Sequence, residues 1–368
     1  MKKHFIFLTL TLIFLALLLL IPHRPVKSSL TCPTPSLNYY TAYPPFITST
    51  SVQPNVMIVM DNSGSMFNLA YPDGWSSTIT NNCSTTNCTD FTVGGTRTYP
   101  TFKYYGYFNP DYWYTYSSNK FRPQAPKTGS GLAGASAKAA SEWDGNFLNW
   151  LTMRRVDVMR KILTGGKATG AGANISLSAE IADCSARGIY KMIASPSLYM
   201  DSAYSDVTGF TINTAGGSCN GSGSGTSSFT VVRPGTDPTY NVDLLTGGVT
   251  PQGILQRMWT SLRWGVSIYN QNAPTPQGGK IKRAILKNNT RGDFENDINN
   301  DRPNSNTPLA ETLWTDVGYF AQTASWPAIG SPGPRYNMGD YTVNATNDPY
   351  NYGTGGQPVY IDCAKAFI

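Results

Sequence analysis

The stretch Val56–Met66, VMIVMDNSGSM, decides the fold, because an apolar run ends there at an acid that two hydroxyl residues follow. Val56–Met60 has the length and composition of a strand buried on both faces. Asp61, Ser63 and Ser65 come next at alternate positions. With this spacing one carboxylate and two hydroxyls can point into a common space at the end of the strand. They are hard oxygen donors, which suit Mg²⁺ and, as alternatives, Ca²⁺ or Mn²⁺.

Neutral hydroxyl ligands leave a divalent ion short of negative charge, so the ion keeps affinity for an acidic group supplied by a partner. Such a site favours adhesion over catalysis. The alternative interpretation of DNSGS taken alone is an Asx-type turn that caps a helix.

The first 29 residues have the layout of a secretory signal peptide. Lys2 and Lys3 precede an apolar run from Phe5 to Ile21, and small residues follow it. An uncleaved membrane anchor is the alternative, and it is the only membrane contact that we expect. Residues 30–54 then form an N-terminal extended segment, and the chain is expected to be exported to the periplasm or the outer cell surface.

Charge and histidine content exclude several function classes once that leader is set aside. The leader holds four of the 28 basic residues and no acid, which leaves 24 basic and 22 acidic residues and a net charge of +2. This balance gives no reason to expect nucleic-acid binding. His4 and His23, the two histidines, both lie in the leader. Serine–histidine and cysteine–histidine catalysis and histidine-ligated metals are therefore excluded.

Six cysteines favour disulfide bonds in an exported chain. Cys83 and Cys88 are the best local pair, and a bond between Cys184 and Cys219 is plausible. Cys32 and Cys363 stay unassigned because spacing alone does not fix connectivity.

Periodic segments after the first strand are few, and two long stretches with loop character, about 67–146 and 167–250, separate them. The first periodic segment predicts an amphipathic helix at Phe147–Leu163, which Thr164–Gly166 ends. There follow a short helix at Gly253–Leu262 and two strands at Arg263–Asn270 and Lys280–Leu286. A second amphipathic helix at Leu309–Phe320 comes next, and CAKAFI at the end is the beginning of a strand. Helices that alternate with buried strands indicate an α/β fold with a doubly wound, mostly parallel sheet, covering residues 55–368 with the two stretches as insertions.

The stretch MIVMDNSGSM resembles the metal-ion-dependent adhesion site (MIDAS) motif of von Willebrand factor A domains. Those domains add a threonine from a second loop, and in SNTPLAETLWTDVGYF Thr307 stands before the expected helix. The resemblance therefore implies a metal site formed by Asp61, Ser63, Ser65 and Thr307. The motif's further aspartate, usually in TDG after a later strand, is not present before Ile368. We accordingly expect a domain truncated at its C-terminal end and a site that this chain leaves incomplete.

A narrower resemblance covers most of the chain beyond the leader. GNFLNWLTMRRVDVMRKILTGGK, LQRMWTSLRWGVSIYN, NTPLAETLWTDVGYF and CAKAF are similar to segments of the PilC/PilY family of proteins associated with the type IV pilus tip. The resemblance implies a non-enzymatic pilus assembly factor and adhesin. Its expected partners are pilus-tip or minor pilin proteins and a host or surface ligand with an acidic group. It also implies a C-terminal β-propeller, which we do not expect within these 368 residues.

Other features have competing interpretations. We expect Asp293–Asp301 to be a solvated loop, with calcium binding as the alternative. We expect the aromatic stretch Tyr99–Tyr116 to be packing, with a carbohydrate-binding surface as the alternative. Arg154, Arg155, Arg160 and Lys161 are expected on a solvated helix face. The alternative function is a secreted carbohydrate-active enzyme with paired carboxylates such as Glu142 and Asp144.

Overall fold

The computed structural model of the chain describes residues 52–71, 103–127, 138–181, 189–191, 196–212, 227–270, 278–303, 305–323, 347–353, 359–360 and 364–368. The leader and all six cysteines lie outside these ranges, so the leader and disulfide predictions stay untested. Within the described ranges, no helix combines the length and apolar character needed to span a bilayer.

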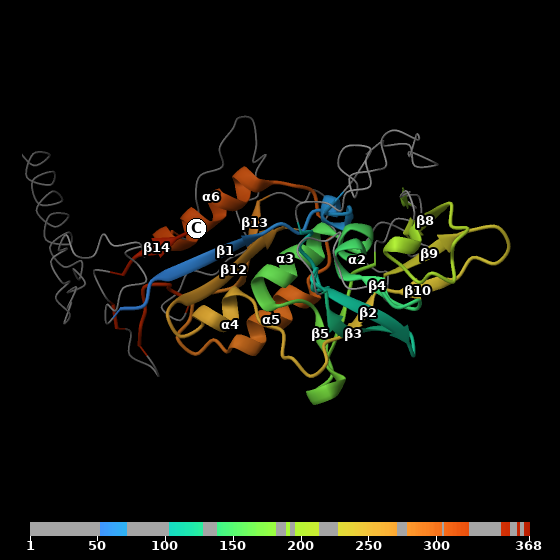
Figure 1. Cartoon of the computed structure of the whole chain (residues 1–368). Coiled ribbons are helices and arrows are strands. Elements are labelled where there is room, and N and C mark those ends of the chain that lie inside the picture. The colour runs from blue at the N-terminus through green and yellow to red at the C-terminus, as the bar shows by residue number, and fades with distance from the viewer. Residues whose placement is uncertain are drawn as a thin grey trace, which may run out of the picture.

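The apolar run forms β1 (Asn55–Met60), which lies inside a four-stranded sheet of order β13-β12-β1-β14 (Figure 1). On either side of β1, β12 (Arg263–Tyr269) and β14 (Ala366–Phe367) run parallel to it. The edge strand β13 (Gly279–Arg283) is antiparallel to β12. Few residues join β12 to β13, fewer than a parallel crossover needs, so these two strands pair as a hairpin.

Helices cover both faces of this sheet (Figure 1). On one face α3 (Arg155–Thr164), α4 (Ile254–Met258) and α5 (Arg291–Asn300) enclose an apolar core that includes Met60 and Val266. On the other face α6 (Leu309–Ala321) packs around Met57 and Tyr319. Met57 and Met60 point to opposite faces because side chains alternate along a strand. The α/β prediction is thus confirmed at the level of a mixed α/β fold. The described strands do not make a complete doubly wound parallel sheet.

The stretches expected to be loop-rich insertions instead build two further sheets, so that expectation is wrong for their described part. One sheet has the order β4-β2-β3-β11-β6-β5, and the other is antiparallel with the order β10-β9-β8-β7. Their strands are β2 (Tyr112–Ser117), β3 (Lys120–Pro126), β4 (Trp143–Asp144), β5 (Ala168–Thr169), β6 (Ser176–Ser178), β7 (Ile189–Lys191), β8 (Gly209–Ile212), β9 (Ser228–Val232), β10 (Thr239–Asn241) and β11 (Asp243–Leu245). Most are too short for their alternation to stand out from the polar connections around them.

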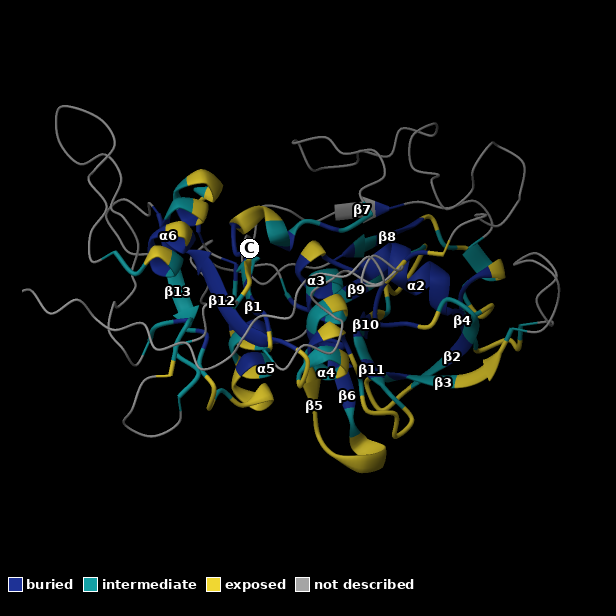
Figure 2. Cartoon of the chain, turned by 90° about the vertical axis from the view of Figure 1, so that its left-hand side faces the viewer, coloured by how far each residue is buried: buried dark blue, intermediate teal, exposed yellow. Residues whose placement is uncertain are grey.

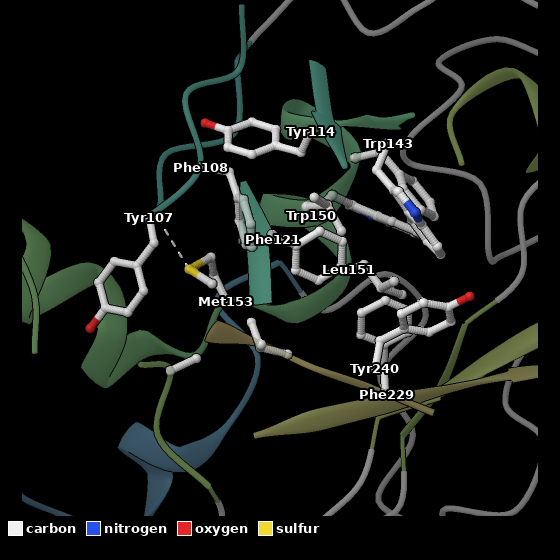
Figure 3. Close-up of a cluster of buried hydrophobic side chains, with 14 of the residues drawn as sticks. Tyr107, Phe108, Tyr114, Phe121, Trp143, Trp150, Leu151, Met153, Phe229 and Tyr240 are labelled. Atoms are coloured by element: carbon white, nitrogen blue, oxygen red, sulfur yellow. Dashed lines mark hydrogen bonds between the residues drawn. The ribbon is translucent and has the colours of Figure 1, made fainter. Parts of the chain in front are cut away.

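An aromatic core joins these sheets to α2 (Gly145–Thr152), a helix whose residues are all buried (Figures 2 and 3). Phe121 lies at its centre, with its ring centroid 5.4 Å from that of Phe108 and 5.7 Å from that of Trp143. Both contacts are edge-to-face, the arrangement that aromatic quadrupoles favour. For the described part of Tyr99–Tyr116, five aromatic residues are buried, so the packing interpretation is confirmed there: Tyr104, Tyr107, Phe108, Trp113 and Tyr114.

The helix expected over Phe147–Leu163 is two helices, α2 and α3, separated by extended backbone at Met153 and Arg154. The break occurs because Arg154 forms a β-bridge with Leu69 in the segment that follows the first strand. The predicted end of this stretch is confirmed: Gly165 follows α3 with φ 87°, a left-handed conformation that favours glycine.

Residues Asp293–Asp301 are not a loop, because α5 includes most of them. Phe294 and Ile298 are four positions apart and both are fully buried, which provides the helix with an apolar side. Thr290 caps its first turn by accepting a hydrogen bond from the Asp293 amide. The surrounding asparagines and aspartates concealed this signal in the sequence.

Candidate metal centre

The carboxyl end of β1 presents the three residues that the motif singled out. The Asp61 carboxylate accepts a hydrogen bond from the Ser63 amide at 2.8 Å, which folds the turn. The Ser63 and Ser65 hydroxyl oxygens lie 2.9 Å apart. Ser65 lies in the short helix η2 (Gly64–Phe67) and is exposed, whereas Ser63 is buried. The predicted convergence of these two hydroxyls is therefore present in the fold.

A second loop lies directly against this turn. Ser305, which precedes α6, pairs with Ser63: the Gly64 amide donates to the Ser305 carbonyl at 3.1 Å. The Ser305 amide donates in turn to the Asn62 carbonyl at 3.1 Å, and the Ser305 hydroxyl contacts the Asn62 side chain. Two loops that are some 240 residues apart in sequence are thus held together by backbone hydrogen bonds.

Asn62 connects both loops to the end of a second strand, β12. Its side-chain oxygen accepts a hydrogen bond from the Tyr269 amide at 3.0 Å, at the carboxyl end of β12. Asn62 is 1 % exposed, so these hydrogen bonds replace water at a buried amide side chain. Sequence reasoning missed both Asn62 and Ser305. Asn62 occupies an unspecified position of the motif, and nothing near Ser305 in sequence marks its contact.

Thr307 lies two residues after Ser305 in the same loop and is exposed. Its carbonyl accepts a hydrogen bond from the Leu309 amide at the beginning of α6. The fold thus places the Thr307 loop beside the Asp61 turn through Ser305. A role of Thr307 as a metal ligand remains a prediction.

The donor set at this edge fits a hard divalent cation. It offers one carboxylate, two adjacent hydroxyls and an exposed threonine, and no lysine or arginine among the described residues pairs with Asp61. The charge of Asp61 affects the phenol of Tyr269. Burial is the main cause that raises the pKa of this phenol, and the negative charge of Asp61 raises it further. In the described part of the chain, no three histidine, cysteine, aspartate or glutamate side chains cluster as a metal-binding group. A metal here would depend on hydroxyl ligands, as MIDAS-type sites do.

Two of the basic residues expected on a solvated helix face are buried instead, so that expectation is wrong for Arg154 and Arg160. Arg154 is 1 % exposed, and its guanidinium donates to the Phe67 carbonyl at 2.6 Å and the Glu180 carbonyl at 3.0 Å. Arg160 is fully buried and pairs with the Glu180 carboxylate at 2.7 Å. Arg155 is exposed, as predicted.

The two acids considered for carbohydrate chemistry have structural roles. Asp144 is completely buried, caps α2 and forms a 2.6 Å ion pair with Lys127. The Glu142 carboxylate accepts a hydrogen bond from the Ala139 amide at 2.7 Å. Burial raises the pKa of Asp144, and the Lys127 charge opposes that effect. A residue that is sealed into a helix cap cannot contact a glycosidic bond, so this pair does not support the enzyme alternative.

The fold and this edge together describe a mixed α/β protein whose sheet presents hydroxyl and carboxylate donors beside an aromatic-rich second unit. Residues 96–241 match the family described as "PilY1 homolog, small alpha/beta domain". That segment includes most of the aromatic core and most strands of the two additional sheets. The expected resemblance to PilC/PilY-type proteins is thus confirmed, and the chain contains a PilY1-homolog domain.

A stretch of 63 residues is 38 % identical to a type IV pilus biogenesis factor PilY1 homolog of Xylella fastidiosa strain Temecula1. The match covers 17 % of this chain and 4 % of that relative. No solved structure matches the chain.

Proposed function

We propose that this chain is a non-enzymatic, exported type IV pilus assembly factor and cell-surface adhesin module. It binds an acidic group of a partner through a divalent ion held by Asp61, Ser63, Ser65 and Thr307. The pilus part rests on the PilY1-homolog domain and on the similarity to a pilus biogenesis factor. Mg²⁺ is the proposed ion, with Mn²⁺ and Ca²⁺ as substitutes. Pilus-tip proteins and acidic surface ligands are the proposed partners.

The single observation that carries the metal part is the convergence of the Ser63 and Ser65 hydroxyls, 2.9 Å apart, beside an acid with no cationic partner among the described residues. The sheet supports a von Willebrand factor A-like arrangement: β1 lies between two parallel neighbours, an antiparallel strand forms one edge, and helices cover both faces. In such sheets ligands bind at the carboxyl ends of the strands, which is where Asp61 lies.

Mn²⁺ binding to the purified chain tests the metal site, because Mn²⁺ substitutes for Mg²⁺ and is visible by electron paramagnetic resonance. Binding is expected to be weak but measurable, since the site lacks the later aspartate that the motif would add. We expect Asp61→Ala to weaken Mn²⁺ binding by about tenfold or more, since it removes the only carboxylate of the ligand set. Asp111→Ala is the matched control: this exposed acid pairs with Lys103 on another part of the surface and should leave Mn²⁺ binding unchanged. Equal Mn²⁺ affinity of the wild type and Asp61→Ala would rule out the site.

A further inference from the structure

The two loops of the proposed metal site are both fastened to one buried acid, Glu180, which follows β6 in the PilY1-homolog domain. Glu180 is 2 % exposed. Its backbone is fixed by that domain: its own amide donates to the Asp157 carboxylate at 2.8 Å, and the preceding residue, Ala179, hydrogen bonds with the backbone of Val242 and Ser227. The Glu180 backbone therefore has a fixed position within the domain.

The first loop reaches Glu180 through Arg154. This guanidinium donates to the Glu180 carbonyl and to the carbonyl of Phe67, the second residue after Ser65. Backbone hydrogen bonds reinforce the connection: the Arg155 amide donates to the Asn68 carbonyl at 3.0 Å, and the Ala70 amide donates to the Met153 carbonyl at 2.9 Å. The segment that leaves the proposed metal site is thus attached along its length to the α2–α3 junction.

The second loop reaches Glu180 through two other arginines. Arg160 pairs with the carboxylate and donates to the Asp301 carbonyl at 2.9 Å, just before the loop that carries Ser305 and Thr307. Arg302 lies in that connection itself, with its guanidinium nitrogen 3.4 Å from the carboxylate. The same guanidinium lies over the Phe67 ring, 5.4 Å from its centroid, so it also touches the first loop.

Glu180 stays ionised in this environment because cations surround it. Burial alone would raise the pKa of the carboxyl, but the charges of Arg160, Lys167 and Arg302 outweigh burial and hold the pKa below its ordinary value. A buried anion that neutralises several cations is costly to remove, because the cations then lose their compensating charge. The Glu180 carboxylate therefore anchors the second loop through Arg160 and Arg302, and it reaches the first loop through the contact of Arg302 with Phe67. Arg154 attaches the first loop to the Glu180 carbonyl.

We infer that Glu180 is a positioning residue which fixes the Asp61 turn and the Thr307 loop relative to each other, and through which the PilY1-homolog domain sets the geometry of the metal site. This inference rests on the proposed metal site. It assigns a role to the additional domain, which contributes no ligand. Such supporting residues commonly change metal affinity roughly 10–100-fold when they are altered.

Two variants and two controls test the inference. Glu180→Gln keeps the shape of the side chain and removes its charge. Arg302→Gln detaches one loop without leaving an unpaired buried acid, because Arg160 and Lys167 still face the carboxylate. Lys167→Gln removes a cation that also pairs with Glu180 but holds neither loop. Asp144→Asn breaks a different buried ion pair of the same domain and controls for loss of stability.

Hydrogen–deuterium exchange is measured without metal, and Mn²⁺ affinity is measured separately. We expect Glu180→Gln and Arg302→Gln to accelerate amide exchange in residues 301–309 and to weaken Mn²⁺ binding by roughly tenfold. Exchange in residues 63–70 should accelerate less, because both variants keep the contact of Arg154 with the Glu180 carbonyl. Exchange in β8 and β9 should not change. The two controls should leave both loops and Mn²⁺ affinity as in the wild type.

The outcomes separate this inference from the metal site on which it rests. If the wild type fails to bind Mn²⁺, the proposed metal site fails, and loop exchange alone then decides whether Glu180 fixes the loops. If both loops exchange at the wild-type rate in Glu180→Gln and Arg302→Gln, the positioning role is refuted whatever the metal result. If the Lys167→Gln control loosens the loops equally, the role is not specific to the arginine contacts and is also refuted.

Discussion

Asp316 is a fully buried acid on the side of α6 that faces the sheet. One carboxylate oxygen accepts a hydrogen bond from the Ser267 hydroxyl at 3.0 Å, and the other has no hydrogen-bond partner among the described residues. Burial raises the pKa of Asp316 to about 7, although the Ser267 hydrogen bond opposes this. The neighbouring strands supply no charge that offsets burial, which distinguishes Asp316 from Glu180.

We predict that Asp316→Asn flattens the dependence of stability on pH between about 4 and 7. In this window the native carboxyl keeps a proton that the unfolded chain releases, so wild-type stability falls as pH rises. The full effect is on the order of 4 kcal/mol for a pKa that moves from an ordinary aspartate value to about 7. Urea unfolding at several pH values measures it, with Asp111→Asn as the control. Parallel pH curves for the wild type and Asp316→Asn would contradict the assignment.

Single residues also show where sequence patterns stop being informative. Asp61, Ser63 and Ser65 could be selected from the sequence because the turn that gathers them is local. The burial of Arg154 and Arg160 could not be predicted, because their partner carbonyls come from segments that lie far away along the chain. A buried arginine and a solvated arginine have the same helical spacing, and only their surroundings differ.

At the scale of elements, α6 has an inverted distribution of side chains. Its bounds, Leu309–Ala321, agree closely with the helix predicted at Leu309–Phe320. Its buried side is largely polar, with Thr312, Thr315 and Asp316 against the sheet, whereas three apolar residues are exposed: Leu309, Leu313 and Val317. Thr315 donates to the Glu311 carbonyl and accepts from the Gly279 amide at 3.0 Å. The helical period could be predicted, but the side that faces the sheet could not.

The helix α5 offers a test of local capping. The Thr290 hydroxyl accepts from the Asp293 amide and donates to the Asp293 carboxylate at 2.7 Å. We predict that Thr290→Ala destabilises the protein by about 1 kcal/mol, because a first-turn amide loses its cap. Thr290→Ser keeps the hydroxyl and should retain most of the stability. Thermal unfolding measures both variants. Equal losses for alanine and serine would show that the methyl group, and not the cap, matters.

At the scale of the whole molecule, a layer of buried polar contacts, here called the polar seam, lies between two apolar cores. The aromatic core of the PilY1-homolog domain and the core under the parallel sheet are linked by the salt bridges of Glu180 and by the hydrogen bonds of Arg154. Because this seam is buried and charged on both sides, opening it would expose unpaired ions. We therefore expect the two cores to unfold together.

Phe121→Ala tests this cooperativity. Its ring lies at the centre of the aromatic core and is completely buried, so truncation should cost about 3–5 kcal/mol. We predict that amide exchange in urea then shifts to lower denaturant in β12 as well as in β9, although Phe121 belongs to the aromatic core alone. A shift confined to β9 would show that the two cores unfold independently.

The sequence by itself determined the first strand, the turn that follows it, the end of α3 at glycine and the resemblance to pilus-tip proteins. Each of these depends on residues that are near one another along the chain. Only the tertiary structure decided that the supposed insertions form sheets, that α6 buries its polar side, and that Ser305 and Glu180 join the two loops of the proposed metal site. These features depend on contacts between distant segments, which no local pattern of hydrophobicity or spacing records.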